Sequence, residues 1–222
     1  MNTLLKGIEI LRQGDTDIES LFSPRCNEII SLLEHYIKEI ELFNPAYGLV
    51  GVETTEDLIV KHILDSLAPL GIIFRLTTEQ PAKIADVGSG AGLPGLPLAA
   101  ALPDHQFTLI ERMGRRAGFL LNTAAVLKLS NVSIEEKEVE KTAPQNFNII
   151  TFRAFKPLEP KLLKALFKIC AHNGKIAAYK GRREKIEQEM RPLEKLCGGW
   201  EAIPYKVPFL EEERHLLIIN PA

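Results

Sequence analysis

Apolar residues recur at a helical period through the first third of the chain, and the pattern changes near Lys83. Between residues 23 and 67 they return every three or four positions, which predicts amphipathic helices with one buried face. We expect residues 1–67 to be helical. The expected boundaries are a break at Asn44-Pro45, a cap at Thr54 or Thr55, and an end of the helical part at Pro69 and Gly71.

From residue 83 onward, short apolar strands alternate with helical patterns. This order predicts a parallel, doubly wound sheet, because a crossover helix is needed between parallel strands. Only residues 208–214 separate the last two strands, so we expect an antiparallel hairpin there. The expected strands are 83–87, 106–110, 131–135, 147–152, 175–179, 200–207 and 214–220, and the expected helices are 94–102, 113–129, 157–170 and 183–196.

A glycine-rich turn follows the first expected strand, in residues 84–95 (IADVGSGAGLPG). Its alternating glycines let backbone N–H groups approach a ligand closely, and the start of the next helix adds positive partial charge. Glu111 closes the second strand, where a carboxylate can accept hydrogen bonds from both hydroxyls of a ribose. The two features predict a nucleoside-binding site; the alternative is a plain turn beside a solvated strand end.

Two nucleoside cofactors fit such a turn. Residues 90–95 spell the dinucleotide pattern G-x-G-x-x-G, but the first glycine after the strand is Gly88, so the frame is shifted. Asp86 at the strand end would repel a pyrophosphate, whereas S-adenosylmethionine has no phosphate and carries an ammonium and a sulfonium group. The residues favour S-adenosylmethionine, with an NAD-binding oxidoreductase as the alternative.

The expected fold is α/β. A mostly parallel seven-stranded sheet that ends in an antiparallel hairpin is typical of the class I (Rossmann-like) methyltransferase fold. We expect residues 71–222 to form the methyltransferase domain and residues 1–70 to form an N-terminal helical extension packed on it.

Composition restricts the partners. The chain has 222 residues, 45% of them hydrophobic and 25% charged, and no apolar run is long enough to span a membrane. Cys26, Cys170 and Cys197 are too few and too widely spaced for a disulfide framework or a CxxC metal site, so we expect a reducing cytoplasm and no metal. A net charge of −2 means that an RNA-binding surface must be a local patch. The candidate basic residues are Arg115, Arg116, Lys180, Arg182 and Arg183, with solvated helix faces as the alternative.

Five segments match one known family in its order. They are residues 60–67 (VKHILDSL), residues 86–95, Arg153-Ala154-Phe155, Tyr179-Lys180-Gly181 and Glu213-Arg214-His215-Leu216. With these motifs the chain resembles the bacterial RsmG/GidB family, the small-subunit ribosomal RNA guanine-N7 methyltransferases. It departs from the family's common pattern at residues 48–50, which read Gly-Leu-Val, at Phe152, and at Glu111, where aspartate is common.

The resemblance implies S-adenosylmethionine as the cofactor and 16S ribosomal RNA as the partner, naked or within the small ribosomal subunit. It implies a guanine of the decoding-region stem-loop as the acceptor, and we expect a monomer. The family's cofactor contacts fall on Gly88, Leu93, Val139, Glu140 and Arg153, and the turn and strand-end residues Asp86, Ser89, Gly90 and Glu111 complete the predicted cofactor site.

The residues also restrict the methyl acceptor. Enzymes that methylate an exocyclic amine usually present Asn/Asp-Pro-Pro-aromatic after the fourth strand, where residues 151–155 read TFRAF. Cytosine C5 methylation needs a cysteine nucleophile, and only Cys170, at a helix end, is a candidate. Guanine N7 has an in-plane lone pair and no proton to lose, so it requires no general base. The missing motifs are consistent with N7.

Arg153 and Phe155 follow the fourth strand on the crevice side of the expected sheet. We expect Arg153 to position the cofactor carboxylate or an RNA phosphate, with an ion pair to Asp86 as the alternative. Phe155 is expected to stack on a flipped base or to join the core. His62 and Asp65 share one helix face near the crevice.

A small-molecule methyltransferase and a non-enzymatic RNA-binding protein are the remaining alternatives for the function of the chain.

Overall fold

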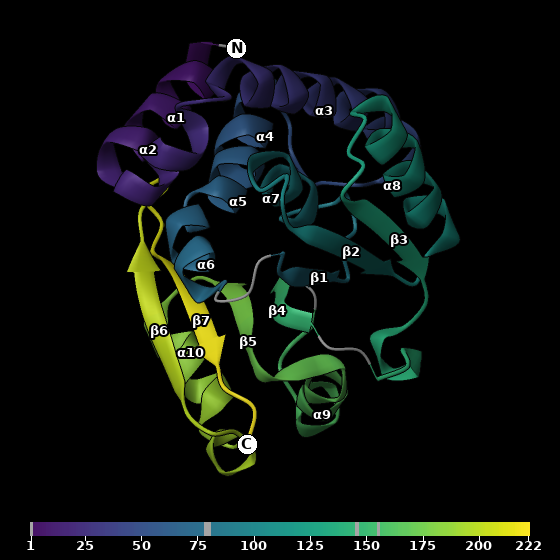
Figure 1. Ribbon diagram of the computed structural model, residues 1–222, viewed down its shortest axis with the longest axis vertical. Coiled ribbons are helices and arrows are strands. Elements are labelled where there is room, and N and C mark those ends of the chain that lie inside the picture. Colours follow the sequence, from purple (N-terminus) through teal and green to yellow (C-terminus); the bar gives the residue numbers. More distant parts are fainter. Residues whose placement is uncertain (1, 78–80, 145–146, 155) are drawn as a thin grey trace.

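A computed structural model describes residues 2–77, 81–144, 147–154 and 156–222. Its centre is a seven-stranded sheet in the order β3-β2-β1-β4-β5-β7-β6, with helices on both faces (Figure 1). The strands are β1 (Lys83–Val87), β2 (Gln106–Glu111), β3 (Val132–Glu136), β4 (Phe147–Arg153), β5 (Cys170–Lys180), β6 (Trp200–Tyr205) and β7 (Arg214–Ile219).

The sheet is parallel from β3 to β5 and becomes antiparallel where β7 pairs with β5 and β6. The prediction of a mostly parallel sheet that ends in a hairpin is therefore confirmed. Because β1, β2, β4 and β5 run in one direction, their carboxyl ends lie along the same edge. That edge carries the residues at the ends of these strands, namely Val87, Glu111, Arg153 and Lys180.

Alternating side chains of the strands bury two separate faces. Ile84 and Leu109 point into a core shared with the N-terminal helices, whereas Ala85 and Ile110 point into a second core beneath α9 (Pro160–Ile169) and α10 (Arg183–Met190). Successive side chains of a strand point to opposite faces, so a strand covered on both faces is apolar at consecutive positions. The helices are α1 (Asn2–Gly14), α2 (Thr16–Phe22), α3 (Cys26–Tyr47), α4 (Thr55–Leu58), the π-helical turn η1 (Ile59–Leu64), α5 (Asp65–Leu67), α6 (Leu70–Leu76), α7 (Gly95–Ala101), α8 (Gly114–Val126), the 3₁₀ turn η2 (Val139–Lys141), α9 (Pro160–Ile169), α10 (Arg183–Met190) and the 3₁₀ turn η3 (Glu194–Leu196).

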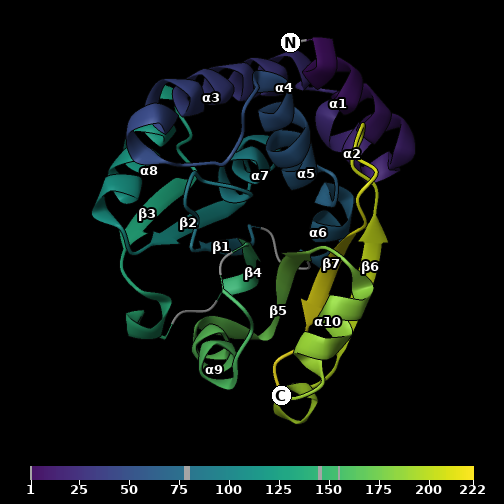
Figure 2. The ribbon, with the colours of Figure 1, turned by 180° about the vertical axis from the view of Figure 1, so that it is seen from behind.

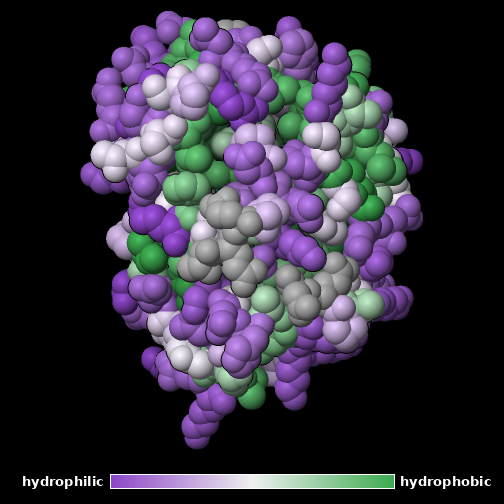
Figure 3. Space-filling model, viewed as in Figure 1, coloured by the Kyte–Doolittle hydropathy of each residue, from purple (hydrophilic) through white to green (hydrophobic). Residues whose placement is uncertain are grey.

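The helices fall into two unequal layers. Helices α3 to α8 lie over one face of the sheet and α9 and α10 over the other, which the view from behind also shows (Figure 2). Seen from the side of Figure 1, hydrophilic side chains cover most of the surface, and hydrophobic ones gather on the side where α8 lies (Figure 3). Leu121 and Val126 of α8 are both exposed.

Two helix boundaries differ from the sequence prediction. Helix α3 continues through Asn44-Pro45 and ends at Gly48, whose φ of +57° is the left-handed conformation of a helix end. Pro45 lies in the last turn and removes one backbone hydrogen bond there, and the helix continues for only two residues beyond it. Helix α6 starts directly after Pro69, because proline is well tolerated at a helix start. The predicted cap at Thr54 is confirmed, since its hydroxyl accepts a hydrogen bond from the N–H of Asp57 at 3.0 Å.

Candidate active site

A cavity of about 220 Å³ opens at the carboxyl ends of β1 and β2 and is closed on one side by η2. We call it the nucleoside cavity. Four residues predicted to bind the cofactor line it: Gly88, Glu111, Val139 and Glu140. Its other lining residues are Val87, Ile110, Arg112, Met113, Arg116, Lys137, Glu138, Ala154 and Lys156.

Backbone hydrogen bonds fix the carboxylate of Glu111 in this cavity. Glu111 Oε2 accepts from the N–H of Gly90, and Oε1 accepts from the N–H of Met113, each at 2.9 Å. The side chain is buried, so it cannot swing away into solvent. Each oxygen has a second lone pair. Glu111 is therefore an oriented acceptor for two neighbouring hydroxyl groups.

The glycine turn has a backbone that other residues adopt only at a cost. Gly88, Gly90 and Gly92 have φ values of +69°, +58° and +92°. Ser89 Oγ donates to the carbonyl of Asp86 at 2.8 Å, which closes the turn. Ser89, Gly90 and the buried Leu93 thus shape the turn; none of the three is among the described lining residues of the nucleoside cavity.

Asp86 lies behind the turn, fully buried. Its Oδ2 accepts from the N–H of Gly95 at the start of α7, at 3.1 Å, and Oδ1 has no hydrogen-bond partner among the described residues. Burial raises the pKa of Asp86 to about 7, although the positive charge of Arg153 opposes that rise. The carboxyl group consequently supports the turn from below and titrates near neutral pH.

A larger cavity of about 650 Å³ adjoins the first one and shares Ala154 and Lys156 with it. We call it the polar cavity. Its walls come from segments far apart in the sequence, because the ends of β4, β5, β6 and β7 meet the η1–α5 segment here (Figure 1). The lining residues are Lys61, His62, Asp65, Phe152, Arg153, Ala154, Lys156, Pro157, Tyr179, Lys180, Gly181, Glu189, Tyr205 and Arg214.

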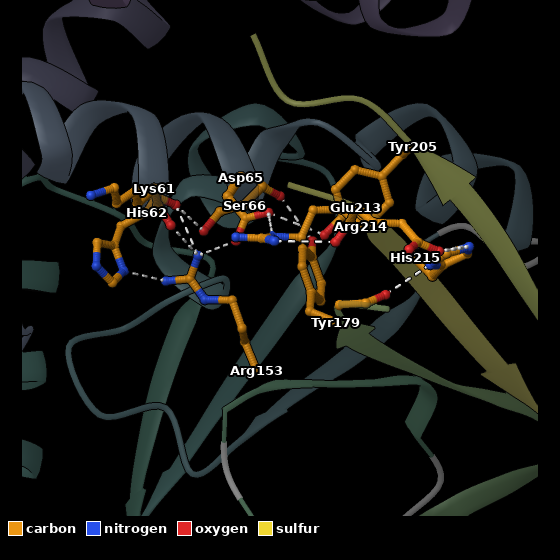
Figure 4. A network of polar contacts seen from close by, with 11 residues as sticks. Lys61, His62, Asp65, Ser66, Arg153, Tyr179, Tyr205, Glu213, Arg214 and His215 are labelled. Carbon is orange, nitrogen blue, oxygen red and sulfur yellow. Dashed lines mark hydrogen bonds and ion pairs between the residues drawn. The ribbon is translucent and has the colours of Figure 1, made fainter. Parts of the chain in front are cut away.

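Asp65 is the centre of a hydrogen-bond network in the polar cavity (Figure 4). Its Oδ2 accepts from Arg153 Nη1 at 3.0 Å, and its Oδ1 accepts from the hydroxyl of Tyr205 at 3.2 Å and faces Arg214 Nε at 3.4 Å. Tyr179 donates to the carbonyl of Ser66 at 2.8 Å. The network joins the N-terminal helices to the carboxyl edge of the sheet.

Arg153 therefore has a different partner from the one suggested by the sequence. The alternative of an ion pair with Asp86 is wrong, because Arg153 pairs with Asp65. Its Nη1 also donates to the carbonyl of His62 at 3.2 Å, and its Nη2 lies 3.0 Å from His62 Nδ1. A guanidinium has only donors, so Nδ1 must be the acceptor and the ring proton is on Nε2. Burial and the charge of Arg153 lower the pKa of His62 to about 4.

The predicted basic patch is divided by the fold. Arg115 stacks over the ring of Tyr47, with 5.5 Å between Cζ and the centroid, and Arg116 donates to the carbonyl of Gly48 at 3.3 Å. Both hold the end of α3 against α8, and Arg116 also lines the nucleoside cavity. On the other side of the site, Lys180 lines the polar cavity and pairs with Glu189, while Arg182 and Arg183 are exposed at the start of α10. Phe155 lies outside the described residues.

Sequence reasoning did not identify Tyr205 or Glu189 as site residues. Tyr205 is at the end of β6 and Glu189 is in α10, and each is surrounded by residues typical of any amphipathic element. Only the hairpin and the helix crossover bring them to the polar cavity. Arg214 was part of a matched motif, and its contact with Asp65 gives that motif a structural role.

The described cysteines do not supply a nucleophile at this edge. Cys170 begins β5 at the opposite edge of the sheet, and burial raises the pKa of its thiol to about 11. Among the described residues, no group of three or more histidine, cysteine, aspartate or glutamate side chains could hold a metal ion. In the same part of the chain, no helix is long and apolar enough to cross a membrane.

An open parallel sheet that ends in a hairpin, with a glycine turn and an acidic strand end at its carboxyl edge, defines a class I methyltransferase. Solved structures have the same fold. One is a putative S-adenosylmethionine-dependent methyltransferase from Methanococcus maripaludis, with a TM-score of 0.61 and 15% identity over 84% of this chain and 92% of that one. Another is tRNA (m1A58) methyltransferase TrmI from Aquifex aeolicus, with a TM-score of 0.56 and 13% identity over 72% of this chain and 68% of that one.

The chain belongs to the family described as rRNA small subunit methyltransferase G, whose model matches residues 29–217. Ribosomal RNA small subunit methyltransferase G of Treponema denticola is 40% identical, with 87% of each chain covered. The protein of the same name from the Nichols strain of Treponema pallidum is 43% identical over 86% of this chain and 85% of its own. Family and fold confirm the predicted resemblance and the prediction of an S-adenosylmethionine-dependent methyltransferase.

Proposed function

We propose that this protein transfers the methyl group of S-adenosylmethionine to N7 of a guanine in 16S ribosomal RNA, in the decoding-region stem-loop. The observation that carries the proposal is the pair of adjoining cavities at the carboxyl edge of the sheet. The smaller one suits a nucleoside, and the larger one has the polar lining that a nucleotide needs. They meet at Ala154, where a methyl donor and an acceptor base would face each other.

The residues around the polar cavity suit an acceptor that keeps its protons. His62 is neutral, and its Nδ1 already accepts from Arg153. Asp65 accepts hydrogen bonds from Arg153 and Tyr205 and forms an ion pair with Arg214. Neither side chain is placed to remove a proton from a substrate. Guanine N7 attacks through a lone pair and loses no proton, so the protein has only to align the reacting atoms and exclude water.

In this proposal Gly88, Glu111, Val139 and Glu140 hold the nucleoside of the cofactor. S-adenosylmethionine supplies an electrophilic methyl group next to a sulfonium. Arg153 is near enough to both cavities to position either the cofactor carboxylate or an RNA phosphate, since it lies beside Ala154 and keeps its planar donor fork in the site. Asp86, Ser89, Gly90 and Leu93 maintain the turn that this binding requires.

The RNA partner is proposed to approach over the polar cavity. Among its described lining residues, five cationic side chains face two carboxylates, and because Lys61 and Lys156 also pair with Asp57 and Glu140, a small positive excess remains in a chain of net charge −2. Lys180, Arg182 and Arg183 extend this charge along the start of α10. Arg115 and Arg116 border the opposite end of the site. The protein is proposed to act as a monomer in the cytoplasm, with residues 1–70 as an extension of the catalytic domain.

The test is transfer of labelled methyl groups from S-adenosylmethionine to small-subunit RNA and to small ribosomal subunits that lack the modification. The RNA is then digested to nucleosides and the labelled product identified. We expect 7-methylguanosine from a single position. Arg153→Ala should reduce transfer by about 100-fold or more, because small misplacements of reacting groups are costly. It should also lower the free energy of unfolding, because Arg153 is a partner of the buried Asp65. A different labelled nucleoside would overturn the acceptor assignment and leave the fold and the cofactor intact.

A further inference from the structure

An enzyme that methylates N7 must distinguish guanine from adenine, because both purines present an N7 lone pair on the same edge. They differ on the Watson–Crick edge, where guanine presents N1–H and an N2 amino group as adjacent donors. A carboxylate accepts from both donors and is repelled by the acceptor N1 of adenine. The polar cavity offers two carboxylates among its described lining residues, Asp65 and Glu189.

Asp65 is not available for this role. Its side chain is only 5% exposed, and its two oxygens face Arg153, Tyr205 and Arg214. Replacing any of these donors with a base would leave a buried guanidinium or hydroxyl without a partner, which costs more than one new hydrogen bond returns. The network of Asp65 is therefore a closed structural unit.

Glu189 has the properties that Asp65 lacks. Its side chain is 19% exposed, and it projects from α10 into the polar cavity. Lys180 Nζ donates to its two oxygens at 2.9 and 2.7 Å, and the N–H of Leu158 donates to Oε1. Among the described residues, Oε2 accepts only from Lys180. A lone pair of Oε2 thus remains for a ligand, and the bond from Leu158 keeps the carboxylate oriented.

The position of Glu189 also fits the shape of the base. N7 lies on the edge of the purine next to the Watson–Crick edge, and its lone pair points roughly at a right angle to the N1–H bond. With N7 directed at the junction of the two cavities near Ala154, the Watson–Crick edge faces a side wall of the polar cavity. Glu189 lines the polar cavity but is not among the described lining residues of the nucleoside cavity, so it lies away from the junction. Flipped bases are commonly read by hydrogen bonds to this edge.

We propose that Glu189 is the specificity-determining residue: the remaining lone pair of its Oε2 accepts a hydrogen bond from the N2 amino group on the Watson–Crick edge of the acceptor guanine. The inference rests on the proposed function. The same contact assists the reaction: as N7 gains the methyl group, the purine becomes cationic and its N2 amino hydrogens become stronger donors. A carboxylate on those donors binds the transition state more tightly than the neutral base. No proton is transferred, and the sulfonium leaves as a neutral thioether.

The experiment compares RNA with guanosine and RNA with inosine at the methylated position. Inosine keeps N7 and N1–H and lacks only the N2 amino group. The wild-type protein should methylate the inosine RNA with kcat/KM roughly 10- to 100-fold lower, as expected for one lost hydrogen bond to a charged group. Glu189→Ala should bring the two substrates within about threefold of each other, and it should do so mainly by slowing the guanosine reaction.

Two controls separate specificity from folding and RNA binding. Glu187→Ala removes an exposed acid of the same helix, paired with Arg183, and should keep the wild-type preference. Glu189→Gln keeps an acceptor for Leu158 but has one acceptor oxygen in place of two, so it should also lose most of the preference. Equal rates on both RNAs with the wild-type protein, or an unchanged preference in both Glu189 variants, overturn the proposal. A product other than 7-methylguanosine from the guanosine RNA would instead refute the proposed function.

Discussion

The nucleoside cavity and the polar cavity adjoin, but they are constructed differently. The first is built on local backbone features: a glycine turn, a strand end, and one carboxylate held by two main-chain N–H groups. The second is made of charged and aromatic side chains from six separate segments, several of which are joined through Asp65. The first depends on local conformation, and the second depends on the assembly of the whole chain.

This contrast indicates how each region should respond to substitution. A change in the nucleoside cavity should affect ligand binding and leave the fold nearly intact, since few distant contacts pass through it. A change in the Asp65 network should affect the stability of the whole molecule, because that network joins the N-terminal helices to β4, β6 and β7. Four predictions test this difference.

The largest effect is expected for Gly88→Val. Gly88 has a φ of +69° and lines the nucleoside cavity, so valine brings both backbone strain and a branched side chain into the ligand's space. Binding of S-adenosylmethionine, measured by calorimetry, should become undetectable. Gly118→Val is the matched control, because a side chain at Gly118 in α8 meets no atom within 4 Å. Wild-type affinity in Gly88→Val would exclude this cavity as the cofactor site.

A second large effect is expected for Asp65→Ala, on stability. The substitution leaves Arg153 and Arg214 without their shared carboxylate in a largely buried site, which costs about 3–5 kcal/mol in comparable cases. Urea unfolding should show this loss in the free energy of unfolding. Asp57→Ala, which removes the half-buried partner of an exposed Lys61 on the same helical segment, should cost less than about 1 kcal/mol. If the two variants had the same free energy of unfolding, the Asp65 network would not be what joins the N-terminal helices to the sheet.

Glu111→Ala should have an intermediate effect, confined to binding. It removes the acceptor for ribose hydroxyls and leaves the N–H groups of Gly90 and Met113 without their partner. We expect the binding free energy of S-adenosylmethionine to weaken by about 1–3 kcal/mol, measured as a rise in Kd. Glu136→Ala, at the exposed end of β3, serves as the control. An equal loss of affinity in both variants would mean that general charge, and not the oriented carboxylate, favours the ligand.

The smallest effects concern pH, and they have opposite signs in the two regions. The pKa of His62 is about 4 in the folded protein and near 6.5 when unfolded, so the unfolded chain binds more protons and stability falls as pH drops from about 6.5 to 4. His62→Gln should flatten that loss, by on the order of 2 kcal/mol.

The pKa of Asp86 is raised to about 7, so its contribution to stability is lost as pH rises from about 4 through 7. Asp86→Asn should flatten this second slope, and urea midpoints across pH 4–8 measure both.

The sequence predicted the sheet well because its signals are local, and four of the predicted cofactor-binding residues line one cavity. Strand positions follow from short apolar runs, and the largest error is the start of β5, which lies at Cys170 and not at 175. The end of α3 was wrong because the helix continues through Pro45, at the loss of one backbone hydrogen bond, and ends at Gly48. The alternative pairing of Arg153 with Asp86 was wrong because the fold brings Asp65 of the N-terminal helices to Arg153.

By itself, the sequence determined the order of strands and helices, the glycine turn with Glu111, and the family motifs, because each of these is specified by neighbouring residues. Only the tertiary structure decided what the separated motifs do. His62 and Asp65, Arg153, and Arg214 stand in different segments, and the sheet topology brings them to one edge, where burial makes their charges depend on each other. Electrostatic contacts of this kind act over a few ångströms in space, so spacing along the chain carries no record of which residues they join.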